Sequence, residues 1–234
     1  MKLKTKLLAL VLPLLVFSSC SNKDNNKAEQ QYKETFYVDK NNDIVEKDEI
    51  GDRIVLNWYS DPSCGACLLL ESQTRNHKNE FLADDAVINH NLVAYLNDYS
   101  VDASSIILAT VNTEPDIAPE LYDAIVDEEF FDTVRKAQYS DFNSVEKIFK
   151  EQYDKIGGKD WNKIIKLKPE MEKIIRKNTE HFATGQDIEE ISSIEGPYTP
   201  FLYTDEIGKS LEIFRDGDPV SDIKKMIEDS KNQK

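Results

Sequence analysis

The sequence has no hydrophobic run long enough to cross a membrane as a helix, and it has few of the residues that build metal sites. Its longest apolar stretch, residues 7–17, is well short of the roughly 18 residues that a membrane-spanning helix needs. Only three cysteines and three histidines occur, and the histidines stand singly, without the paired spacing typical of zinc sites. We therefore expect no retained transmembrane helix, no metal ion and no cofactor.

Basic residues are also scarce relative to acidic ones. The chain has 29 Lys and Arg residues against 44 Asp and Glu residues. Residues 1–20 contain three of the lysines and no acid, so their removal would leave 26 basic residues against 44 acidic ones, a net charge of −18. A chain this acidic is poorly suited to bind nucleic acid, or to adhere to anionic lipid headgroups through a basic patch.

Residues 1–20 have the pattern of an export signal. Three lysines precede the apolar stretch, and Ser18-Ser19-Cys20 follows it. A cysteine directly after two small residues resembles the lipobox of bacterial lipoproteins, in which that cysteine receives a diacylglyceryl group and becomes the mature N-terminus. The resemblance implies a lipid on Cys20 that anchors the chain to the cell membrane outside the cytoplasm. The alternative is an ordinary secretory signal in which Cys20 is incidental.

Beyond the signal, the pattern of apolar residues predicts a tether, an α/β domain and an inserted block of helices. Residues 21–33 are polar and typical of a flexible tether. Residues 103–185 repeat apolar side chains at helical intervals, which predicts four or five helices and no strand. The flanking residues, 34–102 and 186–232, form the α/β domain. We predict its strands at residues 35–38, 44–45, 54–59, 85–95, 201–203 and 211–214, and its helices at residues 64–81 and from 219 onward.

Cys64 and Cys67 are separated by Gly65 and Ala66 at the predicted start of a helix. This spacing brings both sulfurs within disulfide reach, and the free amides and dipole of the first helical turn stabilise a thiolate on Cys64. A lowered pKa makes Cys64 a good leaving group that exchanges readily with thiols. We therefore expect Cys64 to be the exposed attacking sulfur and Cys67 to be the shielded, resolving one. If Cys20 carries lipid, no odd thiol remains.

Two other interpretations of the Cys64–Cys67 pair are weaker. Half of a zinc site would need two further ligands, and the remaining cysteine and scattered histidines do not supply them. A purely structural disulfide that closes so small a loop would constrain the unfolded chain little.

Several features together resemble the DsbA-like branch of the thioredoxin-fold oxidoreductases. They are the strand at 54–59, the turn Ser60-Asp61-Pro62 before the cysteines, the helical insertion, and Thr199-Pro200 before a late strand. The resemblance covers about residues 36–227 and implies a thioredoxin-like α/β fold with a central mixed sheet. It also implies that the bond before Pro200 is cis and that Thr199 and Pro200 position a substrate peptide as an added strand. The alternative is a trans proline at the start of an edge strand.

The chain departs from the pattern of that family at two places. Strongly oxidising members often carry Pro-His between the cysteines, whereas Gly65 and Ala66 offer only backbone amides and the helix dipole. Members commonly place an acid on the preceding strand, where this chain has Trp58. We interpret the nearest acid, Asp61, as a turn residue rather than as a charge that acts on the thiols. We interpret the aromatic residues around the site as core packing rather than a substrate groove: Trp58, Tyr59, Tyr198 and Tyr203.

These observations predict an extracytoplasmic thiol–disulfide oxidoreductase that forms or exchanges disulfides in exported proteins. Its partners would be unfolded or thiol-containing exported proteins, a membrane redox partner, and the membrane through the lipid on Cys20. Two alternatives stay open, a reductase dedicated to one client and a non-catalytic lipoprotein binding module that docks through its helical block. The direction of electron transfer, oxidase or reductase, also stays open.

Overall fold

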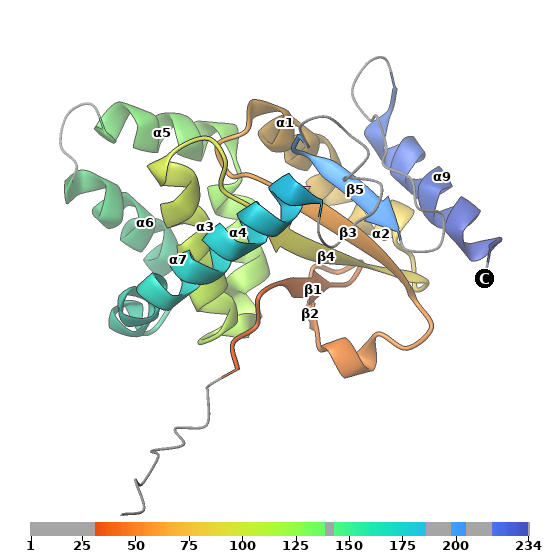
Figure 1. The fold of residues 1–234 in the computed structure, drawn as a ribbon, viewed down its shortest axis with the longest axis horizontal. Coiled ribbons are helices and arrows are strands. Elements are labelled where there is room, and N and C mark those ends of the chain that lie inside the picture. Colours follow the sequence, from red (N-terminus) through yellow and green to blue (C-terminus); the bar gives the residue numbers. More distant parts are fainter. Residues whose placement is uncertain (1–30, 139–142, 186–197, 205–216, 234) are drawn as a thin grey trace, which may run out of the picture. The chain divides into compact units, whose positions relative to one another are not determined.

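The fold is built around a mixed β-sheet with helices packed against it (Figure 1). The computed structural model describes residues 31–138, 143–185, 198–204 and 217–233. The chain divides into two units, residues 1–31 and 32–234, and the fold described below is that of the second. Cys20 and the predicted strand at 211–214 lie outside the described residues.

Within the described residues the sheet has five strands in the order β2-β1-β4-β3-β5. β3 and β4 are parallel, with Trp58 opposite His90, and the other neighbouring strands are antiparallel. Parallel neighbours need a crossover connection, which the helices after β3 supply. The strands are β1 (Phe36–Val38), β2 (Ile44–Val45), β3 (Ile54–Ser60), β4 (Ala86–Leu92) and β5 (Phe201–Thr204).

The two central strands are buried differently from what their sequences predict. β3 reads as apolar on both faces, yet its buried residues alternate with half-buried ones. β4 reads as alternating apolar and polar, yet all seven of its residues are buried, Asn89, His90 and Asn91 included. The reason is position, because β4 is the middle strand of the sheet and a long helix packs against it.

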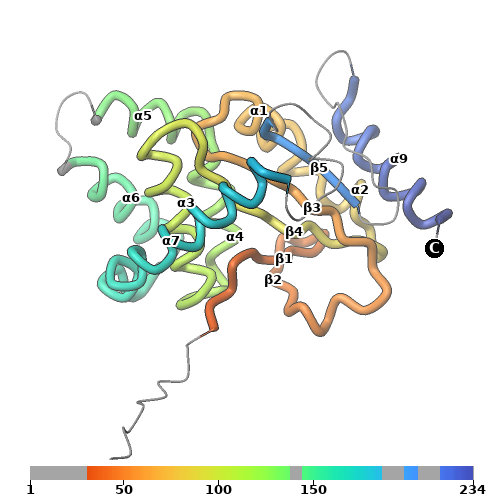
Figure 2. Tube along the Cα trace, in the orientation of Figure 1, coloured from red at the N-terminus to blue at the C-terminus, as the bar shows by residue number. Residues whose placement is uncertain are grey.

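The helical block contains the predicted run of helices without a strand among its described residues. Its first helix begins at Asp98, five residues before the predicted start of the block at 103, because the Asn97 side chain accepts a hydrogen bond from the Ser100 amide and caps the helix there. In the tube view α5 and α6 lie to the left of the sheet and the last helix lies to its right (Figure 2). The block comprises α3 (Asp98–Val111), α4 (Ala118–Ile125), α5 (Glu128–Gln138), α6 (Asn143–Lys155) and α7 (Trp161–Thr184).

The remaining helices belong to the α/β domain. The helix predicted at residues 64–81 is α1 (Gly65–Thr74) followed, after one 3-10 turn, by α2 (Lys78–Phe81). The closing helix α9 (Pro219–Lys231) starts with an Asp218 cap and packs against α1 and α2. None of the helices in the described part of the chain is long and apolar enough to span a membrane.

Candidate active site

The turn after β3 places the two cysteines at the start of α1. Cys64 is the N-cap residue of α1 in an extended conformation, and Gly65 and Ala66 form its first, exposed turn. Cys64 is half-buried and Cys67 is completely buried, and both are free thiols. The geometry thus gives the two sulfurs unequal access to solvent.

The surroundings of Cys64 favour its thiolate. The pKa of Cys64 is lowered to about 6, first by a hydrogen bond from the Cys67 thiol and, against the opposing effect of burial, by the Thr199 side chain and the amides of Cys67 and Ala66. The amides were expected from the helix start, whereas the contributions of Cys67 and Thr199 were not.

Cys67 has the opposite environment. Burial raises the pKa of Cys67 well above its ordinary value, and the hydrogen bond to Cys64 and the charge of its thiolate raise it further. A hydrogen bond with the Asp61 backbone only partly offsets these effects. Near neutral pH the pair therefore holds one thiolate and one thiol.

Thr199 and Pro200, although far away in the sequence, lie beside Cys64. When it carries its proton, the Cys64 thiol donates a hydrogen bond to the Thr199 carbonyl with a sulfur–oxygen distance of 3.3 Å. The Thr199–Pro200 peptide bond is cis, and Pro200 is buried. The next residue, Phe201, opens β5 and pairs with Tyr59 at the end of β3, which explains how the two segments meet.

Asp61 fixes the turn that carries the cysteines. Its buried carboxylate accepts hydrogen bonds from the Ser63 amide at 2.8 Å, the Ser63 hydroxyl at 2.9 Å and the Ser100 hydroxyl at 2.6 Å. Its second oxygen accepts from the amides of Tyr95 at 2.7 Å and Leu96 at 3.3 Å. Asp61 is thus a turn residue, as interpreted, but one that ties the turn to the loop after β4 and to the start of α3.

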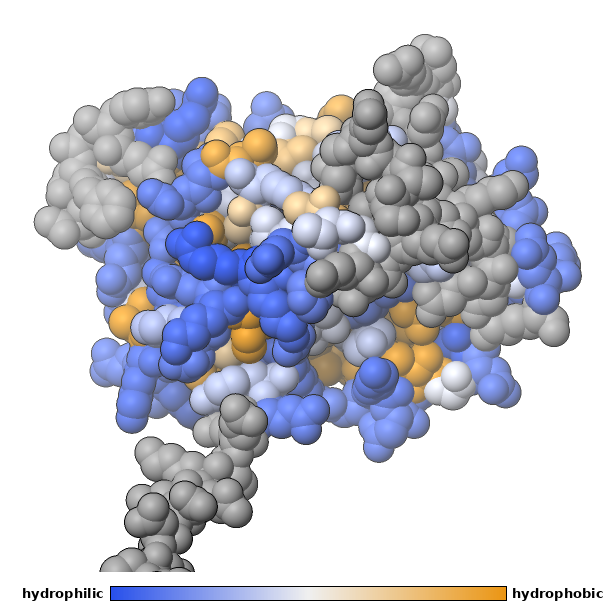
Figure 3. Space-filling view, in the orientation of Figure 1, coloured by the Kyte–Doolittle hydropathy of each residue, from blue (hydrophilic) through white to orange (hydrophobic). Residues whose placement is uncertain are grey.

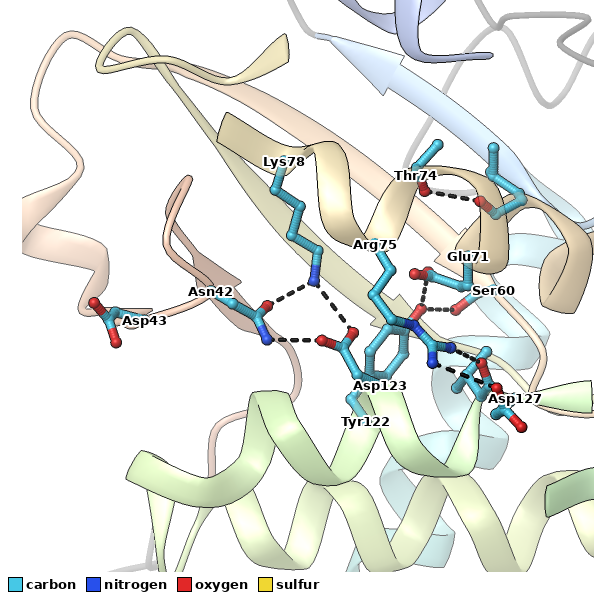
Figure 4. A network of polar contacts seen from close by, with 12 residues as sticks. Asn42, Asp43, Ser60, Glu71, Thr74, Arg75, Lys78, Tyr122, Asp123 and Asp127 are labelled. Atoms are coloured by element: carbon cyan, nitrogen blue, oxygen red, sulfur yellow. Dashed lines mark hydrogen bonds and ion pairs between the residues drawn. The ribbon is translucent and has the colours of Figure 1, made fainter. Parts of the chain in front are cut away.

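A buried acid lies on α1, at a position that the sequence reasoning passed over. Glu71 is only 1% exposed and accepts a short hydrogen bond from the Tyr122 hydroxyl, which lies 3.1 Å from the Ser60 hydroxyl (Figure 4). Burial raises the pKa of Glu71 to about 7, against the opposing charge of Lys78. Its spacing was a usable signal, because Glu71 comes four residues after Cys67 and so shares its buried helix face.

Polar contacts also join α1 and α2 to the helical block (Figure 4). Lys78, which is almost fully buried, contacts Asp123 at 3.2 Å and the Asn42 amide oxygen at 2.6 Å. Arg75 donates to the Val126 carbonyl at 2.7 Å and pairs with Asp127 at 3.4 Å. The segment that directly follows the cysteine-bearing helix is therefore held against the block by charged side chains.

The aromatic residues around the site divide into two groups. Trp58 is in the core, and Tyr59 and Tyr203 pack against Phe201 and its neighbours, as interpreted from the sequence. The packing interpretation is wrong for Tyr198, which is 47% exposed because it precedes β5 rather than lying within the sheet. In the described part of the chain no three His, Cys, Asp or Glu side chains are grouped to hold a metal ion.

Comparison with known proteins identifies the fold. No protein-family model and no curated protein sequence matches this chain. Among solved structures it is similar to MdbA, a thiol-disulfide oxidoreductase from Corynebacterium diphtheriae, with a TM-score of 0.56, 17% identity and coverage of 88% of this chain and 99% of that one. It is also similar to the thiol-disulfide exchange protein α-DsbA2 from Wolbachia pipientis, with a TM-score of 0.56, 15% identity and coverage of 83% and 86%.

A third similar structure is a periplasmic thioredoxin-like protein from Salmonella enterica serovar Typhimurium, with a TM-score of 0.55, 15% identity and coverage of 83% and 90%. The chain has the DsbA-like thioredoxin fold with an inserted helical block, which confirms the predicted fold class.

Proposed function

We propose that this chain, which has the DsbA-like thioredoxin fold, is an extracytoplasmic oxidoreductase that exchanges disulfides with exported proteins through Cys64 and Cys67. The observation that carries the proposal is the inequality of the two thiols. Cys64 is accessible with a pKa lowered to about 6, and Cys67 is buried with a raised pKa. Such a pair suits one attacking and one resolving sulfur.

The exchange runs through a mixed disulfide. A client thiolate attacks Cys64 Sγ of the oxidised pair, the Cys64–Cys67 bond breaks, and Cys67 leaves as a thiolate that takes up a proton. A second client thiolate then attacks the client sulfur of the mixed disulfide and releases the Cys64 thiolate. Two electrons pass to the enzyme, and the client gains a disulfide. The reverse sequence reduces a client disulfide.

The lowered pKa of Cys64 supports the oxidising direction. At pH 7 a thiol with a pKa of about 6 is roughly nine-tenths ionised, and ionisation stabilises the reduced enzyme. Compared with a thiol of ordinary pKa, this ionisation stabilises the reduced enzyme by about 1.4 kcal/mol, which corresponds to about 30 mV in the reduction potential. The effect is modest, because Gly65 and Ala66 add only backbone amides.

Exposed apolar side chains around the site support unfolded proteins as clients. Among the described residues the large hydrophobic side chains that are exposed are Leu69, Tyr95, Leu96 and Tyr198. Leu69 follows Cys67 by two residues, the amides of Tyr95 and Leu96 bind Asp61, and Tyr198 precedes Thr199. Apolar surface gathered at one site is typical of an interaction surface. It would suit clients whose own apolar residues are still exposed, with Thr199 and Pro200 receiving the client backbone.

The anchored location is also part of the proposal. The support is the export signal with its lipobox-like end at Cys20, together with the similarity to a structure described as periplasmic. Mass spectrometry of the membrane-extracted protein tests it, because a diacylglyceryl group on Cys20 and loss of residues 1–19 are both expected. An unmodified Cys20 would refute the lipid anchor.

Oxidation of reduced, unfolded ribonuclease by the pre-oxidised protein tests the chemistry. We expect recovery of ribonuclease activity with the native pair, none with Cys64→Ser, and an unchanged rate with the control Ser72→Ala on the exposed face of α1. Equal activity in Cys64→Ser would refute Cys64 as the nucleophile. A reduction potential near about −270 mV, as in thioredoxin, would instead favour a dedicated reductase.

A further inference from the structure

Basic residues are concentrated in one part of this acidic chain. Ten of the 29 Lys and Arg residues, but only five of the 44 Asp and Glu residues, lie between Lys147 and Lys177. This segment corresponds to most of α6 and α7. Basic and acidic residues are unevenly distributed along the chain, so the negative net charge does not exclude a basic surface on these helices.

The exposed side of α7 carries most of these charges. Five of its basic residues are exposed, and their successive spacings of three, seven, three and one residues place them on one side of the helix. Glu170 and Glu180 are the exposed acids on this side, whereas Lys168 lies elsewhere and pairs with Asp102 and Glu172. In the space-filling view a hydrophilic band follows the course of α7 (Figure 3). We call the five residues the basic face: Lys163, Lys166, Lys173, Arg176 and Lys177.

Most of this positive charge is not committed to partners within the fold. Lys163, Lys166 and Arg176 form no ion pair with any residue in the described ranges. Lys173 pairs with Glu170 at 2.8 Å and Lys177 with Glu34 at 3.1 Å, and both pairs are exposed. Exposed ion pairs contribute little and exchange partners easily, so these two lysines are also available to an anionic surface.

The folded unit begins directly beside the basic face. The Glu34 carboxylate pairs with Lys177, and the Glu34 carbonyl accepts a hydrogen bond from the Asn178 side chain at 3.1 Å. One residue earlier, the Lys33 amide donates to Asn112 on the neighbouring helix at 2.8 Å. These contacts fix the start of the folded unit, directly after residues 1–31.

That point limits how far α7 can lie from a lipid on Cys20. Tyr32 comes twelve positions after Cys20, and twelve steps along the chain span at most about 43 Å when fully extended. The chain therefore meets the folded unit next to its most basic helix, and it does so within reach of the proposed anchor.

We propose that the basic face of α7 binds the anionic phospholipid headgroups of the membrane that anchors the chain. This rests on the proposed lipid at Cys20 and adds the orientation of the folded unit, with α7 against the bilayer. The acidic remainder does not prevent the contact, because its field is screened beyond about 8 Å at physiological ionic strength. None of the five side chains belongs to the candidate active site, so membrane binding leaves disulfide exchange intact.

Vesicle binding by the unlipidated chain, residues 21–234, tests this without the anchor. This chain keeps the whole folded unit of residues 32–234. We expect sedimentation with phosphatidylcholine vesicles that contain about one-third phosphatidylglycerol, but not with pure phosphatidylcholine, and release at about 0.5 M salt. Absence of binding to the anionic vesicles would overturn the proposal. Retention on immobilised polyglutamate without vesicle binding would also overturn it and assign the face to an acidic protein.

Two charge-matched variants locate the binding surface. The test variant Lys166→Glu with Arg176→Glu and the control Lys224→Glu with Lys225→Glu on the exposed side of α9 change the net charge equally. We expect at least about a tenfold loss of vesicle partitioning in the first and less than about a twofold change in the second. Equal losses would show a general charge effect and overturn the assignment to α7.

Failure of the proposed function has a separate signature. Both double variants should oxidise ribonuclease at the native rate, since the substituted residues are outside the active site. An unmodified Cys20 with intact vesicle binding would refute the anchor while supporting a basic face that binds anionic lipid. A lipid on Cys20 without vesicle binding would support the anchor and refute the basic face as a lipid-binding surface.

Discussion

Replacing Asp61 with asparagine should destabilise the folded protein by at least about 3 kcal/mol, although the two side chains have the same shape. The Asp61 carboxylate accepts five hydrogen bonds, three on Oδ1 and two on Oδ2. An asparagine must place its NH2 group where one of these oxygens was. The serine hydroxyls on Oδ1 can rotate to accept, but the Ser63 amide cannot, and neither can the amides of Tyr95 and Leu96 on Oδ2.

The magnitude follows from the less costly of the two orientations. With the NH2 group in the Oδ1 position, one buried amide, that of Ser63, loses its acceptor, which costs about 1–3 kcal/mol. The two bonds to the remaining oxygen change from charged to neutral, and each weakens by about 1 kcal/mol. The sum is about 3–5 kcal/mol, a large part of the roughly 5–15 kcal/mol that typically stabilises a domain.

Urea unfolding, followed by circular dichroism, measures this loss. With a slope of about 2–3 kcal/mol per molar urea, the midpoint should fall by at least about 1 M. Asp116→Asn, the same chemical change at an exposed aspartate, should shift the free energy of unfolding by less than about 0.5 kcal/mol. If Asp61→Asn were as stable as the native chain, the five contacts would not be holding the turn, and the reasoning would be wrong.

The remaining predictions concern the thiols and the buried acid. The alkylation rate of Cys64 should rise with pH to a midpoint of about 6, because only the thiolate reacts; a midpoint near 9 would contradict the thiolate-stabilising site. Thr199→Val removes a hydroxyl that lowers the pKa of Cys64 and should move that midpoint upward, whereas Thr199→Ser should leave it in place; equal midpoints in both variants would exclude the hydroxyl. The pKa of Glu71 is raised to about 7 in the folded state, so the native protein holds this proton more tightly than the unfolded chain does. The protonated side chain therefore contributes to the free energy of unfolding at low pH, and this contribution is lost as the pH rises from about 4.5 through about 7. The loss from this one group is about 3 kcal/mol, and Glu71→Gln should remove it from the pH dependence of urea unfolding; an unchanged pH profile would show that Glu71 ionises freely.

The sequence was sufficient for features that depend on local patterns. Periodicity found the helical block and the strands β3 and β4, and a turn followed by a helical pattern placed Cys64 at a helix start. These features could be predicted because the chain folds them from neighbouring residues.

Features that depend on distant contacts were missed or misjudged. Glu71 looks like an ordinary helix residue until Tyr122, from another helix, covers it. The alternation of polar and apolar residues in β4 is typical of a strand with one exposed face, and only the sheet order shows that the strand is in the middle. Asp61 was correctly taken as a turn residue, but its amide donors at Tyr95 and Leu96 lie more than thirty residues away. Such contacts are fixed by the tertiary fold, which a local pattern does not contain.

Trapping the mixed disulfide tests the central claim, that Cys64 attacks and Cys67 resolves, most directly. Cys67→Ser and Cys64→Ser would each be incubated with a client protein that carries an accessible disulfide, and adducts would be mapped by mass spectrometry without reduction. A covalent adduct through Cys64 should accumulate in Cys67→Ser, because the resolving sulfur is gone, and Cys64→Ser should form none, because Cys67 is buried. An adduct through Cys67, or none in either variant, would contradict the assignment of roles.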